Sequence, residues 1–193
     1  MIVLLATDGS SLRDSKTSTG ETFICAAGYV LEIYEHSNLI YSHSVSKSLG
    51  RSTSNKAEFT ALIMGLEEII TKGYDQLSRV IIISDSEYVI NCVTKWYYTW
   101  RKDKSGTPKT STGTPVKNFD LIQKAYLLFN SLLRGGTFVK IKSHMKVSEY
   151  EKEYKKFKIK NGNFSYLIFD KFRTLNERVD DLVNTCAHKG EIL

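Results

Sequence analysis

Two short apolar runs with the same pattern stand out along the chain. Residues 2–6 and residues 79–83 are both rich in aliphatic and β-branched side chains. A short apolar run bounded by turn-forming residues predicts a strand buried on both faces, at the centre of a sheet. Each run leads into a hydroxyl residue followed by an aspartate, Asp8 in the first case and Asp85 in the second.

These two aspartates are expected at the carboxyl ends of their strands, where open sheets covered by helices place their functional sites. If the strands are parallel neighbours, both carboxylates emerge at one edge. Their repulsion there is costly unless a cation or a proton intervenes. Either aspartate alone is explained equally well as a helix cap or turn residue. The repetition of the pattern favours a metal site.

Residues 55–72 carry apolar side chains at helical spacing, which predicts an amphipathic helix. Asn55 is the expected N-cap and Gly73 the expected stop. Glu58 lies four residues before Leu62 and therefore falls on the inward stripe. Two interpretations of Glu58 stay open: a site carboxylate, or the partner of Asn55 in a capping box.

The rest of the pattern alternates between strands and helices and predicts an α/β fold. Strands are expected at residues 22–33, 38–46 and 137–143, with a polar hairpin loop at 13–21, a turn at 35–38 and a polar loop at 47–54. Helices are expected at residues 86–100 and 118–133 and from about Asn176, with a basic loop at 102–116. Residues 146–160 predict a helical protrusion or a mobile arm, anchored by the apolar run 166–169.

The last helix carries two adjacent aspartates that its periodicity separates. Its inner stripe includes Val179 and Val183. Asp180 lies three residues before Val183 and faces the edge of the core, whereas Asp181 falls on the polar face. Asp180 is therefore the candidate site acid.

Composition places the chain among ordinary soluble proteins. It has 193 residues, of which 41% are hydrophobic and 25% charged, which suits one domain with a sizeable core. No apolar run is long enough for a membrane span, and residues 2–6 are too short for a signal peptide. The three cysteines are widely spaced and odd in number. They favour reduced thiols and a cytoplasmic location.

The positive charge is concentrated in two segments. The net charge is +6, and residues 101–118 hold five Lys or Arg against one Asp. Residues 145–175 hold eight Lys or Arg against four acidic residues. Such segregation suggests a polyanionic partner.

Four acids then fall on two strand ends and two helix faces: Asp8, Glu58, Asp85 and Asp180. Oxygen-only ligands suit hard cations such as Mg²⁺ or Mn²⁺. Two such ions can clamp the attacking and leaving oxygens of a phosphodiester displacement. An acidic pocket beside basic segments is typical of a metal-dependent nuclease.

Five motifs in this order resemble those of the type 1 ribonuclease H family, with its basic protrusion. They are residues 7–10 (TDGS), 55–58 (NKAE), 84–89 (SDSEYV), 142–144 (KSH) and 176–180 (NERVD). The resemblance implies a ribonuclease H-like fold, with a five-stranded mixed sheet and helices on both faces, in one catalytic domain over residues 1–193. Because the first strand begins at residue 2, we expect no separate hybrid-binding domain before it.

The resemblance also implies a reaction, which is Mg²⁺-dependent cleavage of the RNA strand of RNA–DNA hybrids, with two ions per site and Mn²⁺ as a substitute. It makes the four acids the metal ligands, and it makes His144 an aid to proton transfer or product release. We expect a monomer whose partner is the hybrid and not a membrane.

Further residues match the family's substrate contacts. Trp96 and Trp100, four residues apart before a basic segment, match aromatics that contact the DNA strand; core packing is the alternative. Arg51, Thr53 and Asn118 match a DNA-phosphate pocket. Ser54 and Asn55 match contacts in the minor groove, where RNA is distinguished by its 2′-hydroxyls. Asn55 and Asn118 also suit helix caps.

Two departures from the family pattern concern loops. Residues 12–19 replace a glycine- and proline-rich loop after the first aspartate, and residues 145–175 stand where relatives have a short loop. The longer insertion is either a solvated decoration or a second basic arm that grips the hybrid opposite residues 101–118. The competing functions are a DNA junction resolvase and a catalytically idle nucleic-acid-binding module.

Overall fold

The computed structural model describes residues 1–13, 23–102, 106–162 and 165–191. Residues 14–21 of the expected hairpin loop and most of the 12–19 departure lie outside these ranges. No helix in the described part of the chain is long and apolar enough to cross a membrane.

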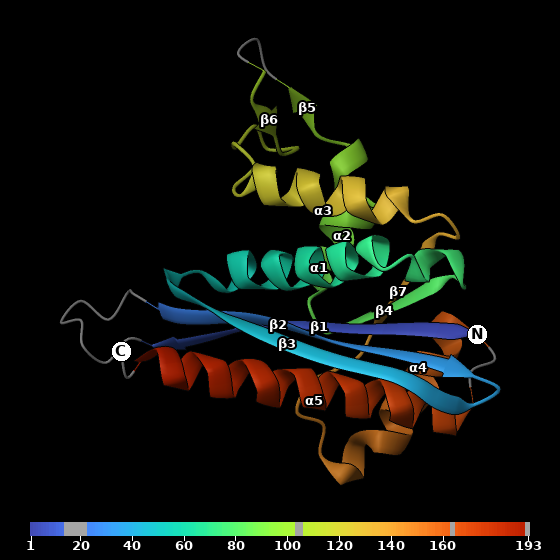
Figure 1. Cartoon of the computed structure of the whole chain (residues 1–193). Coiled ribbons are helices and arrows are strands. Elements are labelled where there is room, and N and C mark those ends of the chain that lie inside the picture. The colour runs from blue at the N-terminus through green and yellow to red at the C-terminus, as the bar shows by residue number, and fades with distance from the viewer. Residues whose placement is uncertain (14–22, 103–105, 163–164, 192–193) are drawn as a thin grey trace.

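A five-stranded mixed sheet forms the middle layer, in the order β3-β2-β1-β4-β7 (Figure 1). The central strand β1 pairs antiparallel with β2 and parallel with β4, and β4 pairs parallel with β7. The bounds are β1 Ile2–Arg13, β2 Phe23–Glu35, β3 Asn38–Ser52, β4 Val80–Ser84 and β7 Gly136–Lys140. This sheet confirms the expected fold class.

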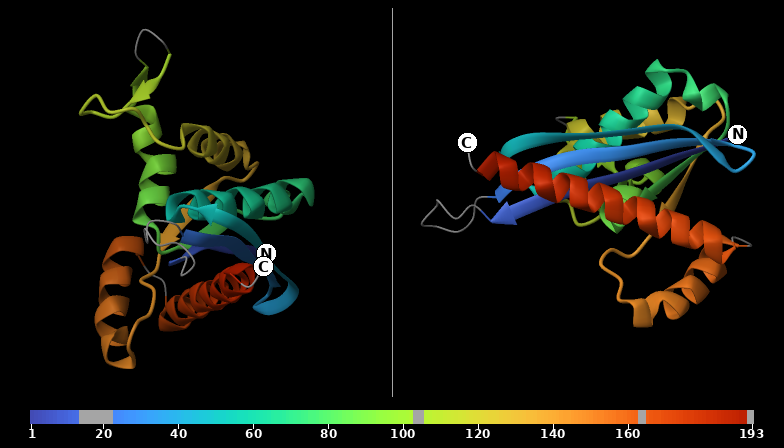
Figure 2. Two further views of the ribbon diagram at one scale, coloured as in Figure 1. Left: turned by 90° about the vertical axis from the view of Figure 1, so that its left-hand side faces the viewer. Right: turned by 60° about the horizontal axis from the view of Figure 1, so that its bottom comes forward.

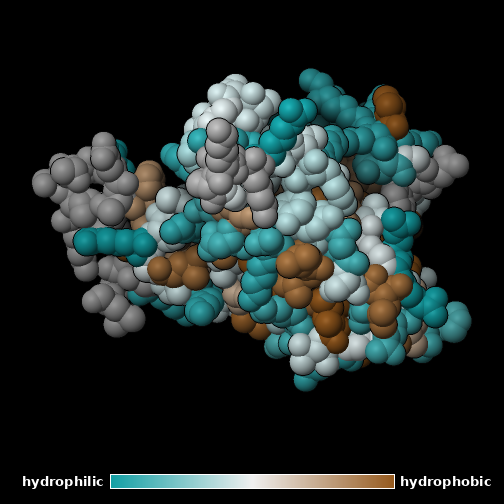
Figure 3. Space-filling view, turned by 90° about the horizontal axis from the view of Figure 1, so that it is seen from above, coloured by the Kyte–Doolittle hydropathy of each residue, from teal (hydrophilic) through white to brown (hydrophobic). Residues whose placement is uncertain are grey.

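Helices cover both faces of the sheet (Figures 1 and 2). On one face lie α1 Ser54–Thr71, α2 Glu87–Thr94 and α3 Phe119–Ser131. On the other lie α4 Tyr150–Asn161 and the long α5 Tyr166–Glu191. The short elements are η1 Tyr74–Gln76, η2 Trp96–Tyr98 and η3 Val147–Glu149, with a small hairpin of β5 Arg101–Lys102 and β6 Pro108–Lys109. Seen from above, the outer surface shows separate hydrophobic patches among hydrophilic ones (Figure 3). Single apolar side chains scattered over the surface in this way are ordinary in folded proteins.

Strand β1 is buried on both faces, as predicted. Val3 and Leu5 contribute to the core beneath α1, while Leu4 and Ala6 contribute to the core beneath α5. The alternation follows from the two-residue period of a strand. β1 thus carries a hydrophobic core on each side and fixes the level at which Asp8 emerges.

Several predicted strand ends were wrong; the strand expected at 137–143, for example, ends at Lys140. β1 does not end before Asp8 but continues to Arg13, because β2 pairs with it along its whole length. What ends near Asp8 is the pairing with β4, whose last matched pair is Ala6 with Ile83. Residues 47–54 were expected to form a loop, but β3 continues to Ser52, with a register shift opposite Cys25 and Ala26. Backbone pairing outweighs the polar side chains there.

Three predicted helix bounds also need correction. Thr53, not Asn55, caps α1, and its Oγ1 accepts a hydrogen bond from the Lys56 N–H at 3.3 Å. α2 ends at Thr94, and the next turn is the 3₁₀ helix η2. α5 begins at Tyr166, ten residues before Asn176, because the buried Phe169, Phe172 and Leu175 extend the apolar stripe towards the N-terminus. The turn at 35–38 and the stop at Gly73 are confirmed.

A buried carboxylate fastens α5 to the sheet. Glu32 on β2 is 1% exposed, and it accepts hydrogen bonds from Lys171 at 2.7 Å, from Arg178 and from Tyr34. Burial alone would raise the pKa of Glu32, but the bonds from Lys171, Tyr34 and Arg178 outweigh it and hold that pKa below its usual value. The folded protein therefore keeps this carboxylate ionised.

Replacing Glu32 with Gln should lower the free energy of unfolding by about 1–3 kcal/mol, because Lys171 and Arg178 lose a charged partner. Urea denaturation at neutral pH measures this. The stabilisation by Glu32 is present above the ordinary carboxyl pKa and is lost as the pH falls through the lowered folded-state pKa, so the difference should shrink in acid. Glu35→Gln, at an exposed position on the same strand, is the control, and an equal loss there would contradict the role of Glu32.

Candidate active site

Three carboxylates converge where β1 and β4 separate. Oxygen atoms of Asp8, Glu58 and Asp85 all lie within 4.8 Å of one another. Asp8 comes from β1, Glu58 from the first turns of α1, and Asp85 directly follows β4. The predicted convergence of Asp8 and Asp85 at one edge therefore holds, although β1 itself continues past it.

Glycine at position 9 allows this convergence. A Cβ built on Gly9 would lie 2.3 Å from the backbone nitrogen of Glu58, so any larger residue would push α1 away from β1. Because Thr53 caps α1, Glu58 is not the third residue of a capping box, and that interpretation is wrong. The Glu58 side chain is instead directed to the acid cluster. The Gly9 N–H also donates to Asp8 Oδ1 at 2.8 Å.

Asp85 is oriented by two residues, Ser143 and Asn176, whose role the sequence pattern does not reveal. The Ser143 hydroxyl donates to Asp85 Oδ2, and Asn176 Nδ2 donates to the same hydroxyl oxygen at 3.2 Å. Asn176 is 2% exposed, and among the described residues its Oδ1 has no hydrogen-bond partner. Both residues belong to motifs that were recognised, but only the folded geometry shows that they reach Asp85.

The last helix supplies the fourth acid. Asp180 lies beside Asp8, and its side chain is 19% exposed, whereas Asp181 faces solvent. The predicted helical register is therefore confirmed. One turn further on, Asn184 accepts a hydrogen bond from Ser10, which ties α5 to β1 next to the site. His144 has its Nε2 3.6 Å from Asp180 Oδ1 and is 76% exposed.

The clustered acids are electrostatically unfavourable without cations. Burial, followed by the charges of Asp85 and Asp180, raises the pKa of Asp8 from 3.8 to about 7. Burial, followed by the charges of Asp8 and Asp85, raises the pKa of Glu58 well above its usual value. A donor set made only of carboxylate oxygens fits Mg²⁺ or Mn²⁺ and not zinc. The structure thus brings three of the four predicted metal ligands within 4.8 Å of one another and places the fourth, Asp180, beside Asp8.

A cavity of about 620 Å³ lies at the N-terminal end of α1, and none of the four acids lines it. It is lined by five of the predicted substrate residues: Thr53, Asn55, Trp96, Trp100 and Asn118. Arg51, on β3, and Ser54, the first residue of α1, are not among the lining residues. Asn118 occupies the N-cap position of α3 in a left-handed conformation, and its side chain makes no capping bond.

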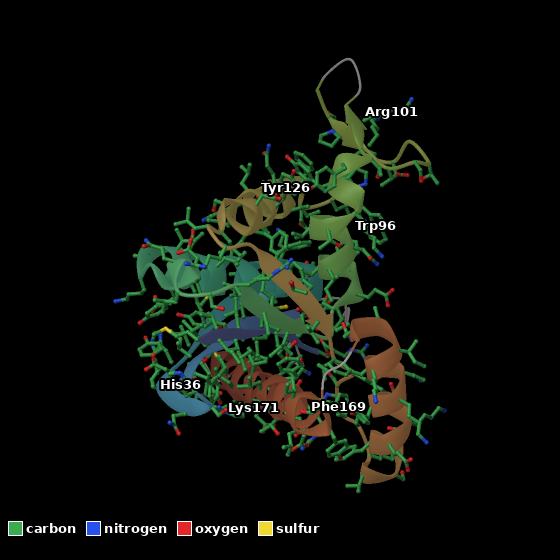
Figure 4. The ribbon with its side chains drawn as sticks, turned by 90° about the vertical axis from the view of Figure 1, so that its right-hand side faces the viewer. His36, Trp96, Arg101, Tyr126, Phe169 and Lys171 are labelled. Atoms are coloured by element: carbon green, nitrogen blue, oxygen red, sulfur yellow. The ribbon has the colours of Figure 1, made fainter. Side chains whose placement is uncertain are left out.

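The two tryptophans do not share one α-helix, because α2 ends before them. The Trp100 N–H nevertheless bonds to the Trp96 carbonyl at 3.2 Å, so both rings stay within one turn and line the same cavity. Trp96, labelled in Figure 4, is 38% exposed and contacts Tyr88 edge-on. Trp100 packs edge-on against Tyr97 and Phe119. Core packing thus applies in part to Trp100, while Trp96 keeps an accessible edge.

A cluster of acids at the edge of a five-stranded mixed sheet, with helices on both faces, is the arrangement of an α/β protein of the ribonuclease H type. The sequence profile of the RNase H family matches residues 2–154. Ribonuclease H of Schizosaccharomyces pombe is 34% identical over 71% of this chain and 44% of its own length. Ribonuclease HI of Haemophilus influenzae is 32% identical over 60% of this chain and 62% of its own. The chain belongs to the ribonuclease H family and spans less than two thirds of these relatives.

Solved structures show the same fold. The PFV ribonuclease H domain superposes with a TM-score of 0.60 at 16% identity, over 96% of this chain and 94% of that one. A ribonuclease H1 isolated from compost gives 0.56 at 21% identity, over 97% and 96%. Asp180 lies beyond the stretch matched by the family profile, so its place in the site rests on the geometry of α5.

In the metal-free protein, Asp8→Asn should raise the melting temperature more at pH ~8 than at pH ~4.5. The folded state holds the Asp8 proton up to a pKa of about 7. The stability that this proton provides is complete below the unfolded-state pKa and is lost as the pH rises through the folded one. Asparagine at position 8 does not ionise, so the variant does not lose this stability as the pH rises. Thermal melts in a chelator, with Asp181→Asn as the control, measure the effect; equal gains at both pH values would contradict it.

Proposed function

We propose that this chain is an endonuclease that hydrolyses the RNA strand of RNA–DNA hybrids with two Mg²⁺ ions, for which Mn²⁺ can substitute. The observation that carries the proposal is the convergence of Asp8, Glu58 and Asp85 within 4.8 Å, completed by Asp180. Four acids facing a phosphate backbone weaken its binding unless cations lie between them.

These four acids would hold the ions. When bound, a pair of divalent ions supplies a clamp for the attacking and leaving oxygens of the phosphodiester. Ser143 and Asn176 keep the Asp85 carboxylate in position, and such supporting contacts strongly affect metal affinity. His144 reaches solvent beside Asp180, which suits a group that carries a proton or helps product leave.

The cavity beside α1 provides a place for the other strand. Thr53 and Asn118 offer polar groups for a phosphate, and Trp96 offers an aromatic surface for sugars or bases. Arg51 and Ser54 stay proposals of the same kind, at the edge of this region. The exposed Arg101 on the β5–β6 hairpin (Figure 4) adds positive charge beyond it.

The family match supports the choice of substrate. A foamy viral protease-reverse transcriptase with the same fold, at a TM-score of 0.54 and 18% identity over 94% of this chain and 20% of that one, was solved in complex with RNA/DNA hybrid and also with dsDNA. The fold is therefore compatible with hybrid, and the substrate assay has to distinguish hybrid from DNA. We further propose one catalytic domain over residues 1–193 that acts as a monomer. The three cysteines are free, and two of them are buried, which agrees with the proposed cytoplasmic location.

The decisive assay incubates the protein with RNA–DNA hybrid, duplex DNA and duplex RNA, with and without Mg²⁺. We expect cleavage only of the RNA strand in the hybrid and only with the metal. Cleavage of duplex DNA instead would favour a related DNA nuclease, such as a junction resolvase. Metal-independent binding of all three duplexes without cleavage would favour an idle binding module.

The two aspartates of α5 give a matched pair of variants. Asp180→Asn should reduce hybrid cleavage by more than about 100-fold at saturating Mg²⁺, as should Asp85→Asn, because loss of a ligand exceeds the cost of losing a supporting contact. Asp181→Asn should stay within about twofold of the wild type, since it is an exposed surface change. Steady-state rates measure both. The reverse order would show that α5 does not present Asp180 to the metals.

A further inference from the structure

A second cavity, of about 540 Å³, opens between the end of β7 and α4. Asp85 and Ser143 form part of its wall, so whatever occupies it also touches the acid cluster. Four lysines line it, Lys140, Lys142, Lys156 and Lys160. We call this cavity the α4 groove.

The α4 groove is preformed, because α4 is packed firmly against α5. Phe157 on α4 is 5% exposed and contacts Phe169 and Phe172 with ring-centre distances of 5.2 and 6.1 Å. The Arg173 guanidinium lies 4.6 Å from the ring centre of Tyr150. Figure 4 shows Phe169 beside α4. A groove with rigid walls loses little conformational entropy when it binds a ligand.

Helical spacing sorts the charges of α4 between two faces. Residues 153, 156, 157, 160 and 161 recur at intervals of three and four and line the groove. Lys152 and Lys158 are exposed and absent from the lining of the groove. The register of the helix therefore places the cations at 156 and 160 in the groove that Asp85 also lines.

The lysines are held weakly enough to exchange partners. Lys140, Lys142 and Lys156 pair with Glu87, Glu149 and Glu153, and these lysine side chains are 34–61% exposed. Exposed pairs of this kind contribute about 0–1 kcal/mol each. A phosphate that reaches the groove can replace such a carboxylate, and releasing counterions from a polyanion then favours binding.

The α4 groove and the tryptophan-lined cavity lie on opposite sides of α2. Tyr88 faces the tryptophan-lined cavity. Glu87 and Asn91 face a small cavity of about 210 Å³ that shares Lys140 and Lys160 with the α4 groove. Figure 2 (left) shows α2 and α4 one above the other along one edge of the molecule. A duplex has two backbones, and this edge offers a separate groove for each.

We propose that the α4 groove binds the phosphate backbone of the RNA strand next to the phosphate being cleaved, with Lys156 and Lys160 as its contacts on α4. This rests on the proposed function, which places the RNA strand at Asp85. The strand that reaches Asp85 continues past Ser143 into the groove, while the DNA strand follows the cavity of Trp96 and Asn118.

The test compares two double variants with the same loss of charge on the same helix. Lys156→Ala/Lys160→Ala removes lysines that line the groove, and Lys152→Ala/Lys158→Ala removes lysines that do not. Hybrid binding is followed by fluorescence anisotropy across a range of salt concentrations in a chelator. The groove variant should bind about tenfold more weakly, with a log–log salt slope shallower by about one to two units. The control variant should bind as the wild type does. All these side chains are exposed, and circular dichroism checks the fold of each variant.

Neutral methylphosphonate linkages in the hybrid show which of its two strands contacts the α4 groove. Placed in the RNA strand beside the cleavage site, they should weaken binding of the wild type but not weaken the groove variant further. Placed in the DNA strand, they should weaken both proteins equally. If linkages in the DNA strand weaken binding of the wild type but not of the groove variant, the assignment of the RNA strand to this groove is wrong. If the groove and control variants bind alike, the groove does not touch the hybrid.

The binding assay needs no metal, so it separates this proposal from the proposed function. A wild-type protein that cleaves no hybrid, but whose salt slope depends on Lys156 and Lys160, would refute the nuclease and retain the groove. If the variant without both lysines cleaves hybrid normally and its salt slope is unchanged, the nuclease is retained and the groove is refuted.

Discussion

The close contact between β1 and α1 at Gly9 is the constraint on which the site depends. It brings the first turns of a helix against the central strand, and so a carboxylate on each comes within reach of the other. The contact works against electrostatics, since burial and neighbouring charges raise the pKa values of Asp8 and Glu58. The hydrophobic cores on the two faces of β1 hold the acids together despite that cost. A proton relieves this conflict in part, and a bound divalent cation, as proposed, would remove it while keeping all the acids ionised.

Sequence patterns predicted those parts of the fold that depend on local periodicity. The buried residues of β1 and β4, the inward stripe of α1 and the separation of Asp180 from Asp181 all follow from repeats of two or 3.6 residues. These repeats placed each acid on a face of its own element, but they left Glu58 open between two interpretations, and the family resemblance was needed to group all four. Because each acid is fixed by the register of its own element, an error of several residues at the end of that element does not move it.

Features that depend on a distant partner were missed. β1 and β3 extend beyond their apolar stretches because β2 supplies backbone partners along their whole length, and a polar sequence gives no sign of that. The start of α5 was misplaced because its first turns are stabilised by aromatic contacts with α4, a helix that is itself charged and weakly periodic. Ser143 and Asn176 are separated by 33 residues, and only the folded chain shows that both support Asp85.

Helix α5 connects the parts of the molecule that the function requires. Glu32 fastens its middle to β2, Asp180 faces the acid cluster, and Phe169 and Phe172 in its first turns hold α4. The extension of this helix towards its N-terminus therefore also positions α4. Because one continuous helix carries both Asp180 and the aromatic residues beneath α4, the position of the α4 groove is fixed relative to the four acids. In the proposed complex, a strand bound by the lysines of α4 would therefore reach the acids in a defined register, without a flexible arm having to close over it.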